Sequence, residues 1–318
     1  MRKIGVFVAF STLCFNFGYA DNATSGEINV VTKESLPTLS MPMQDIKVVD
    51  SYTTTPQTII DSLKKDFFVD FRKSGAYASE PYMRGRGEKG VAAFIEGMRI
   101  NGSHSDSVNL FGMSEVEEVD VYRGANGALF GNGAATGAVV LKLKDPKFST
   151  TSDVKVSSFV DSKFSFLRES GYSGSVGTSV YNDLLSLSLS GSLNDYSDFK
   201  DGNGDKVLNS KYRSKHYAVS LGVKTSEDSF VYAKYLKDEA DSQDPFSRFR
   251  NNNVWMYTAR PNDEAKMYFL GFKKENIGIF KDLHVQLYKN ELHYDVQQKR
   301  DAATPNQQQL FRDSDLKG

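Results

Sequence analysis

The feature that most constrains the fold is a series of alternating segments from about residue 151 onward. Leucine and serine alternate in LLSLSLSGSL, residues 184–193, and similar alternation recurs in HYAVSLGVK (216–224) and LHVQLYKN (283–290). Because successive side chains of a β-strand point to opposite faces, each segment predicts a strand with one apolar face. Less regular patterns near 154–161, 172–181, 228–238 and 264–275 bring the predicted strands to about seven.

The connections between these predicted strands alternate in length. DSKFSFLRESG, DYSDFKDGNGDKVLNSK and DEADSQDPFSRFRNNNVWMYTARPND are long and polar, whereas ND and TSED are short. Short turns at one rim and long loops at the other are typical of an outer-membrane β-barrel. The alternative, a periplasmic β-sandwich, has shorter strands and no reason to sort its loops in this way. The pattern therefore favours an antiparallel transmembrane β-barrel.

The N-terminus and the composition agree with export. Arg2 and Lys3 precede an apolar stretch that ends at Gly18-Tyr19-Ala20, which is the layout of a cleaved signal peptide over residues 1–20. The one cysteine, Cys14, lies inside that segment, so the mature chain has no disulfide, which fits a bacterial envelope protein. The net charge of −1, without a basic block, argues against a nucleic-acid partner.

Residues up to about 150 have a different pattern, typical of a compact mixed domain. TPQTIIDSLKKDF predicts a short helix, GVAAFIEGMRIN a hairpin that turns at Glu96-Gly97, and VEEVDVYRG a further strand. GRGEKG, residues 85–90, has the glycine spacing of a dinucleotide-binding loop. Those glycines lead into a strand, although phosphate binding needs the N-terminus of a helix, so we interpret them as turn residues.

Two segments of this first half resemble the plug domain of TonB-dependent outer-membrane receptors. YMRGRGEKGVAAFIEGMRIN is similar to the plug hairpin, and VEEVDVYRGANGALFGNGAATGAVVLKLKD to the second plug signature. Glu96, Ala125 and Phe130 stand where the family usually has Asp, Pro and Tyr. GEINVVTKES resembles a TonB box, the segment that such receptors offer to TonB.

The resemblance implies an α+β plug, a small mixed sheet with short helices, followed by a β-barrel that is only partly present. The expected organisation is a signal peptide at 1–20, the TonB box and a linker at 21–45, the plug at 46–148, and the N-terminal part of the barrel at 149–318. Barrels of this family close with more strands than the seven or eight expected here. The chain is therefore expected to be the front part of a larger receptor, or a truncated one.

The TonB box implied by the resemblance comprises Glu27, Ile28, Asn29, Val30, Val31 and Thr32. The implied partner, TonB, would pair with it as an added strand, for which main-chain hydrogen bonds suffice. The alternative for these β-prone residues is a first strand of the plug.

The resemblance also implies contacts between the plug and the barrel. Arg84 and Arg123 stand where plug arginines pair with barrel carboxylates, and Glu117 and Glu118 are candidates for the same network. A purely structural role for these four residues is equally consistent with the sequence.

Candidates for substrate contact lie in the two loops expected at the plug apex. They are Tyr77, Glu80, His104 and Asp106, with ordinary solvated loop residues as the alternative. The methionines at 41, 43, 83, 98 and 113 are scattered, so core packing is preferred to a soft-metal site, and the metal question stays open. The sequence has no HExxH, CxxC or Ser-His-Asp spacing, and neither catalysis nor a cofactor is predicted.

The leading hypothesis is energised uptake across the outer membrane of a scarce nutrient, such as a ferric siderophore, haem or cobalamin. The expected partners are TonB, a small nutrient or metal chelate, and outer-membrane lipid, with the box facing the periplasm. The alternative is a truncated or decayed receptor that acts as a binding or assembly element without transport.

Overall fold

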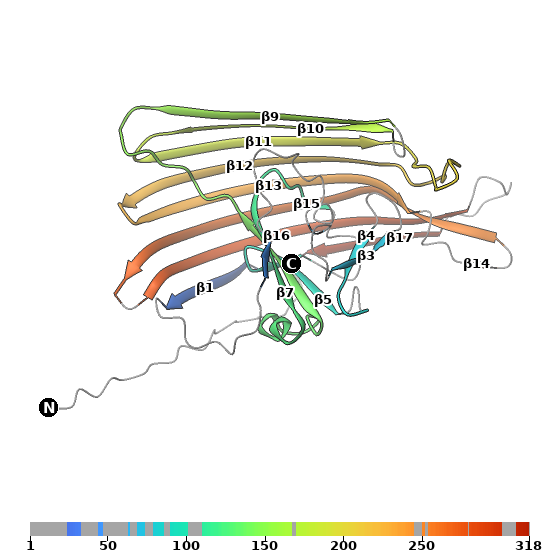
Figure 1. The fold of residues 1–318 in the computed structure, drawn as a ribbon, viewed down its shortest axis with the longest axis horizontal. Coiled ribbons are helices and arrows are strands. Elements are labelled where there is room, and N and C mark those ends of the chain that lie inside the picture. Colours follow the sequence, from blue (N-terminus) through green and yellow to red (C-terminus); the bar gives the residue numbers. More distant parts are fainter. Residues whose placement is uncertain are drawn as a thin grey trace.

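A ten-stranded antiparallel sheet, called here the large sheet, dominates the computed structural model (Figure 1). The structure describes residues 24–32, 44–46, 63, 69–73, 79–85, 90–100, 110–166, 170–244, 250–251, 254–278, 280–300 and 310–317. A five-stranded sheet lies beside the large sheet, together with a separate two-stranded hairpin. Among the described residues, no helix is both long and apolar enough to cross a membrane.

Seven strands of the large sheet follow one another along the chain as neighbours, in agreement with the sequence prediction. They are β9 (Lys155–Ser165), β10 (Gly171–Tyr181), β11 (Leu185–Tyr196), β12 (Tyr212–Ser226), β13 (Ser229–Asp244), β15 (Val254–Ile277) and β16 (Phe280–Arg300). The short β14 (Arg250–Asn251) pairs with β15, and β17 (Leu310–Lys317) pairs with β16.

The predicted sorting of connections is confirmed. Short turns at 182–184, 227–228 and 278–279 alternate along the chain with longer connections at 166–170, 197–211 and 245–253. In Figure 1 the short turns lie at the left end of the strands, and we call this end the short-turn rim. The opposite end is the long-loop rim.

Two predicted loops are shorter than the sequence indicated. Residues 161–171 and 238–263 were expected to form long polar loops, but β9 continues to Ser165, β13 continues to Asp244 and β15 begins at Val254. Pro261 lies within β15, although proline cannot donate a ladder hydrogen bond. The register of β15 shifts between Ala259 and Glu264, so the proline sits in a β-bulge and the strand continues through it.

The two faces of the large sheet differ in polarity, and their arrangement is the reverse of that in a soluble protein. Along β12, Ser214, His216 and Ser220 are buried, whereas Val219 and Leu221 are exposed. The register aligns apolar residues of this exposed face in rows across the sheet. One such row comprises Val180, Leu187, Leu221, Ala233, Leu270 and Leu287. A lipid-facing band has this alternation, with apolar residues outward and polar residues inward.

The five-stranded sheet forms the first domain, and its mixed character was predicted. Its order is β2 (Gln44–Ile46), β7 (Val116–Arg123), β8 (Gly137–Leu143), β5 (Val91–Ile95) and β6 (Met98–Arg99), with β5 and β8 parallel. A 3-10 helix, η2 (Gly124–Phe130), links β7 to the turn before β8. The separate hairpin pairs β3 (Asp70–Lys73) with β4 (Ser79–Tyr82).

Local turns of the first domain agree with their sequence signals. Glu96 and Gly97 have φ angles of 48° and 79°, and Ile95 pairs with Met98, so the predicted two-residue hairpin is confirmed. Gly90 directly precedes β5, so the GRGEKG segment leads into a strand, as inferred. Of the helix predicted around TPQTIIDSLKKDF, only the helical and buried Leu63 is described, and the rest lies outside the described residues.

The segment predicted as a TonB box adds to the edge of the large sheet. β1 (Thr24–Thr32) pairs antiparallel with β16, with Thr24 opposite Lys289 and Thr32 opposite Phe280. β17 pairs with the other half of the same strand, where Lys317 lies opposite Glu291. The two segments therefore lie end to end along β16, and β1 occupies the half next to the short-turn rim. β1 therefore belongs to the large sheet and not to the five-stranded sheet.

A charge placed on the exposed apolar face tests whether that face contacts lipid. Replacing Leu221 by Arg is expected to lower the free energy of unfolding in phosphatidylcholine vesicles by about 2–4 kcal/mol, because a bilayer solvates the guanidinium poorly. Leu208→Arg is the matched control: Leu208 is 52% exposed and Leu221 50%, but Leu208 lies in the 197–211 loop. Urea titration followed by tryptophan fluorescence measures both variants. Equal effects of the two substitutions would contradict lipid contact at Leu221.

Candidate functional site at the interface of the two sheets

Three segments of the first domain contact the buried face of the large sheet. They are the hairpin tip at 96–97, the segment 110–115, and the linker 144–148. The hydrophobic core continues across this boundary, since Val119 and Leu141 of the first domain share one cluster with Tyr232, Met267 and Phe269. The interface therefore combines a continuous apolar core with individual polar contacts.

The hairpin tip is fixed through Glu96. Its Oε1 accepts a hydrogen bond of 2.6 Å from the main-chain N–H of Leu143, and it lies 3.9 Å from Nζ of Lys234 on β13. Gln286 of β16 donates to the Glu96 carbonyl oxygen over 2.9 Å. The side chains of Lys234 and Glu96 are only 3% and 8% exposed. Removing one member of such a pair leaves a buried charge without compensation, which typically costs 3–5 kcal/mol.

Polar side chains of the large sheet surround this ion pair. Nζ of Lys234 lies 4.8 Å from the ring centroid of Tyr232. The Tyr232 hydroxyl donates to Oε1 of Gln286 over 2.5 Å, and it lies 2.6 Å from Nε2 of His284. The network spans β13 and β16, so a movement of the hairpin tip would disturb contacts on both strands.

The segment 110–115 is held by a second buried polar group. The Gly112 N–H donates to Oδ1 of Asp238 over 3.0 Å, and the same oxygen lies 2.7 Å from Nδ1 of His216. Nε2 of His216 lies 3.1 Å from the Ser214 hydroxyl, to which the Asn194 amide donates over 2.9 Å. A Cβ at Gly112 would lie 2.5 Å from Cγ of His216, so only glycine allows this close approach.

Ser214, His216 and Asp238 thus form a hydrogen-bonded Ser-His-Asp arrangement, which their spacing in the sequence did not reveal. The three residues are only 2%, 3% and 2% exposed. A nucleophilic serine needs access to substrate, and here the hydroxyl accepts a hydrogen bond from Asn194 beneath the first domain. The arrangement serves to attach the 110–115 segment, and Ser190 adds a hydrogen bond from its hydroxyl to the Glu115 carboxylate.

The linker 144–148 is packed against the large sheet at several points. Nζ of Lys273 lies 2.6 Å from Oδ1 of Asp145, and the Phe148 ring lies 5.7 Å from that of Phe230. Nζ of Lys144 donates to the Ser114 carbonyl oxygen over 2.5 Å and lies over the Phe159 ring. Burial lowers the pKa of Lys144 despite the nearby carboxylates. The linker and the 110–115 segment are therefore tied together where they meet the large sheet.

Comparison with known proteins identifies the first domain. Residues 22–138 match the family model of the TonB-dependent receptor plug domain. Residues 22–138, which include most of the five-stranded sheet, are therefore identified as a plug domain of this type. The large sheet resembles the wall of the barrel that surrounds such a plug.

Several solved structures share the fold of this chain. The copper transporter OprC matches with a TM-score of 0.62 and 16% identity, over 80% of this chain and 38% of that one. The FrpB iron transporter from Neisseria meningitidis (F3-3 variant) matches with a TM-score of 0.58 and 16% identity, over 81% of this chain and 41% of that one. The alcaligin receptor FauA from Bordetella pertussis matches with a TM-score of 0.58 and 15% identity, over 85% of this chain and 43% of that one. The chain spans about two fifths of the length of these proteins.

The four plug residues predicted to contact the barrel occupy different environments. Arg84 is exposed, with a φ of 52°, and its guanidinium covers Gly124. Arg123 ends β7 opposite Gly137, and Glu117 is exposed. Glu118 lies 3.1 Å from Nζ of Lys142 within the plug sheet. Their predicted role in gating stays a prediction.

Lys142 also lies 2.7 Å from the buried Asp120. Desolvation lowers the pKa of Lys142, but the hydrogen bonds to Asp120 and Glu118 outweigh this and raise the pKa overall. This group stabilises the pairing of β7 with β8 and belongs to the plug itself.

Several other predicted sites fall outside the described residues. Tyr77, His104 and Asp106 are among them, and Glu80 is described only as part of the β4 backbone. The predicted packing role of the methionines is confirmed for Met83, Met98 and Met113, which lie in the core. In the part of the chain that the structure describes, no group of three or more His, Cys, Asp or Glu side chains could hold a metal ion.

Sequence reasoning missed the residues that attach the plug to the large sheet. Lys234 and Asp238 lie an even number of residues from Tyr232 and Leu236 along β13. All four side chains are therefore on the face opposite the apolar band. Charged residues at inward-facing positions of a predicted strand indicate a contact on the inner face of the sheet. Their partners, Glu96 and Gly112, are distant in sequence, and no local pattern connects them.

Substitution of Gly112 tests the close approach to His216. Gly112→Ala is expected to lower the free energy of unfolding by several kcal/mol, because the added methyl displaces His216 and breaks the hydrogen bond to Asp238. Gly202→Ala is the matched control, since a Cβ there meets open space. Chemical unfolding gives the stability, and amide hydrogen exchange over 110–115 shows whether the loss is local. Unchanged exchange in G112A would contradict this attachment.

The Glu96–Lys234 pair is tested by a double-mutant cycle. Glu96→Gln and Lys234→Met should each destabilise the folded chain, because either leaves one buried charge uncompensated. The double variant should be less destabilised than the sum of the two, with a coupling of about 1–3 kcal/mol. Urea unfolding in detergent micelles gives all four stabilities. Strict additivity would mean that the two charges do not interact.

Proposed function

We propose that this chain forms the plug and the first part of the barrel of an outer-membrane receptor that imports a scarce nutrient by TonB-driven transport. The observation that carries the proposal is the attachment of the plug to the inner face of an outwardly apolar sheet by a few buried polar contacts. Such contacts hold the plug while costing desolvation, which suits an attachment that has to be released and re-formed.

A metal or a metal chelate is the proposed class of substrate, with ferric siderophores, haem and cobalamin as the candidates. Support comes from the proteins of similar fold, whose names are those of a copper transporter, an iron transporter and an alcaligin receptor. The proposed contact residues are Tyr77, His104 and Asp106, in the two loops expected at the plug apex, and Glu80, which was expected in the first of these loops but lies on strand β4. Carboxylate, imidazole and phenol groups suit hard and borderline metal ions and polar chelates.

Residues 27–32 are the proposed TonB box. β1, which contains them, lies beside the short-turn rim, the rim that faces the periplasm in outer-membrane barrels. It is the terminal strand in the order of the described sheet, so a further strand has an edge to which it can add. TonB binding by β-augmentation requires an extended and accessible edge of this kind.

In the proposed cycle, substrate binding at the apex biases the plug toward release, and TonB pulls on the box. The contacts that resist are the Glu96–Lys234 pair and the Gly112–Asp238 hydrogen bond. Arg84, Arg123, Glu117 and Glu118 are proposed to contribute at the remaining plug surface. Extraction of the plug would expose buried charges of the wall to water and so create a hydrated path.

The second candidate function is binding without transport. The observation that favours it is the place of β1, which pairs with the half of β16 not covered by β17. A receptor whose N-terminal segment is held in the barrel sheet would bind substrate but would deliver the box poorly. The two functions differ in whether substrate uptake depends on residues 27–32.

Proline substitution tests TonB recognition through the main chain. The variant I28P/V30P should lose binding to the periplasmic domain of TonB, because proline removes the N–H donors and its fixed φ disfavours an extended strand. The control I28A/V30A keeps the main chain intact and should bind within a few-fold of the unmodified chain. A pull-down with purified protein measures both. Equal binding by the proline variant would contradict a box at 27–32.

Uptake by the receptor that contains this chain separates the two functions. Cells that express it should accumulate at least one of radioiron-labelled siderophores, haemin or labelled cobalamin, and deletion of residues 27–32 should abolish the accumulation. Surface binding of the same compound should persist in the deletion variant. Binding without accumulation in both strains would favour the non-transporting receptor.

A further inference from the structure

The inner face of the large sheet carries two lysines near the short-turn rim, called here the inner lysine pair. They are Lys234 on β13 and Lys273 on β15, and the register places them in the inward rows on either side of Tyr232. Tyr232 is opposite Gly271, where a Cβ would lie 2.3 Å from Cζ of the tyrosine. The tyrosine ring therefore covers Gly271, and its centroid lies 4.8 Å from Nζ of Lys234 and 5.8 Å from Nζ of Lys273.

The carboxylates that face the inner lysine pair belong to the first domain and its linker. Glu96, in the hairpin tip, lies 3.9 Å from Nζ of Lys234, and Asp145, in the linker, lies 2.6 Å from Nζ of Lys273. The side chains of Lys273 and Asp145 are 24% and 42% exposed, so ions from solution can replace that contact. Lys234 is buried and depends on the plug for compensation. A plug that moves away from the wall therefore leaves Lys234 as an uncompensated cation.

Charges at neighbouring inward positions of the wall do not compensate Lys234. Lys224 lies in the same row as Lys273 and adds a further cation. Glu275 and Asp282 face each other one row nearer the rim, where Glu275 is exposed and therefore screened by water and salt. Asp238 lies four positions further along β13 and is held by its own hydrogen bonds. The buried part of this region is thus cationic once Glu96 has left.

Lys234 also has hydrogen-bonding capacity that Glu96 does not use. Its side chain is only 3% exposed, and its Nζ has no hydrogen-bond partner among the described residues. Oε1 of Glu96 instead accepts the 2.6 Å hydrogen bond from the Leu143 N–H. An ammonium group carries three donors, and buried donors without partners are destabilising. Lys234 is therefore placed for an anion that can approach more closely than Glu96 does.

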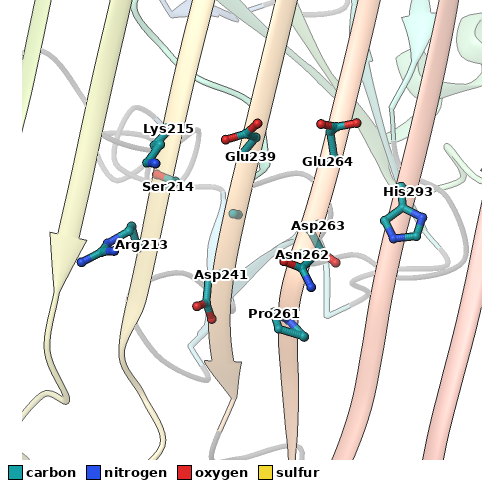
Figure 2. Close-up of a pocket in the computed structure, with 11 residues that line it drawn as sticks. Arg213, Ser214, Lys215, Glu239, Asp241, Pro261, Asn262, Asp263, Glu264 and His293 are labelled. Atoms are coloured by element: carbon teal, nitrogen blue, oxygen red, sulfur yellow. The ribbon is translucent and has the colours of Figure 1, made fainter.

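The other cluster of charges in the described part of the wall lies beside a cavity of about 410 Å³. Figure 2 shows Lys215 and Glu239 on neighbouring strands of this cavity, with Asp241 and Glu264 close by. Lys215 is four positions from the exposed Val219 on β12, so the cavity lies on the outer face of the sheet. All of its lining residues belong to β12, β13, β15 and β16, and its carboxylates outnumber its lysine and arginine. A substrate that passes the plug on the inner face does not meet this cavity.

We propose that Lys234, with Lys273 beside it, forms an anion-binding site that opens when the plug moves and then receives the anionic oxygen groups of the substrate. The inference rests on the proposed TonB-driven transport and adds a charge requirement to its path. Glu96 occupies the site while the plug is seated, so the same lysine first holds the plug and then the substrate. Because the site lies near the short-turn rim, it is the last cationic contact before release to the proposed periplasmic side.

A lock, meaning a contact that only holds the plug, makes a different demand on these residues. A lock needs two opposite charges across the interface, in either order. An anion site needs the positive charge to be on the wall. The two roles are therefore separable by experiment.

Rescue of a plug variant by a small carboxylate tests the site without transport. Glu96→Gly removes the carboxylate and suits the φ of 48° at this turn position. In about 100 mM sodium propionate, the ratio of folded to unfolded E96G should rise about tenfold, which is the effect of a carboxylate with a Kd of about 10 mM. Urea unfolding in detergent micelles measures this ratio, with sodium chloride at the same concentration as the reference.

Two control variants show whether the gain depends on Lys234. E96G/K234M lacks the cation, and E118G loses a carboxylate beside Lys142, whose side chain is 48% exposed and satisfied by water. Neither ratio should rise more than about twofold in propionate. An equal gain in E96G and E96G/K234M would overturn the proposal. If E96G does not fold, D145A uncovers Lys273 and should show a gain that D145A/K273M loses.

Exchange of the two charges separates the anion site from a lock. The variant E96K/K234E keeps opposite charges across the interface but places the carboxylate on the wall. Its uptake of labelled siderophores or haemin, in the receptor that contains this chain, should fall at least about tenfold, because like charges repel an anionic chelate. Surface binding of the same compound should persist. The matched control D195R/R213D exchanges an ion pair on the outer face and should leave uptake unchanged.

The outcomes distinguish this inference from the proposed function. Uptake by E96K/K234E at the unmodified rate would mean that the pair is only a lock, and would overturn the proposal. Accumulation of an uncharged compound alone would do the same. If the unmodified receptor accumulates none of the labelled siderophores, haemin or cobalamin, the proposed function fails, and the propionate experiment still decides whether Lys234 binds an anion.

Discussion

The structure depends on one constraint, the inverted polarity of the large sheet. Its outer face is apolar, and its inner face carries serine, histidine, lysine and aspartate, which have to find partners out of water. The plug supplies those partners, because Gly112 donates to Asp238 and Glu96 faces Lys234. Without the plug, these groups would be exposed to water and the polar contacts would exchange with water.

The plug is attached by few contacts, but they are spread over most of the wall. The hairpin tip contacts β13 and β16, the 110–115 segment contacts β11 and β13, and the linker contacts β13 and β15. Each is a buried hydrogen bond, an ion pair or a close approach of rings at the edge of a continuous apolar core. Such contacts define one seated position, because a small shift leaves several buried polar groups unsatisfied at once.

The edge of β16 shows how strand pairing and function are linked. An unpaired edge is a template for any extended segment, and β1 is the segment that occupies its half beside the short-turn rim. The β-prone character of residues 27–32, which suits them to pairing with TonB, also suits them to pairing with this edge. The same main-chain chemistry thus underlies the position of β1 in the sheet and its proposed exchange with a partner.

The sequence by itself determined the strands, their alternating faces, the sorted turns and the Glu96-Gly97 hairpin, because each depends on residues adjacent or two apart along the chain. The resemblance to the plug, which also depends on short local motifs, predicted the order of the domains. Only the tertiary structure decided that Glu96 meets Lys234, that Gly112 meets His216, and that β15 continues through Pro261. These features join residues more than a hundred positions apart, or depend on a neighbouring strand that accepts a bulge. No local pattern encodes such distances, because burial and pairing are properties of the assembled sheet.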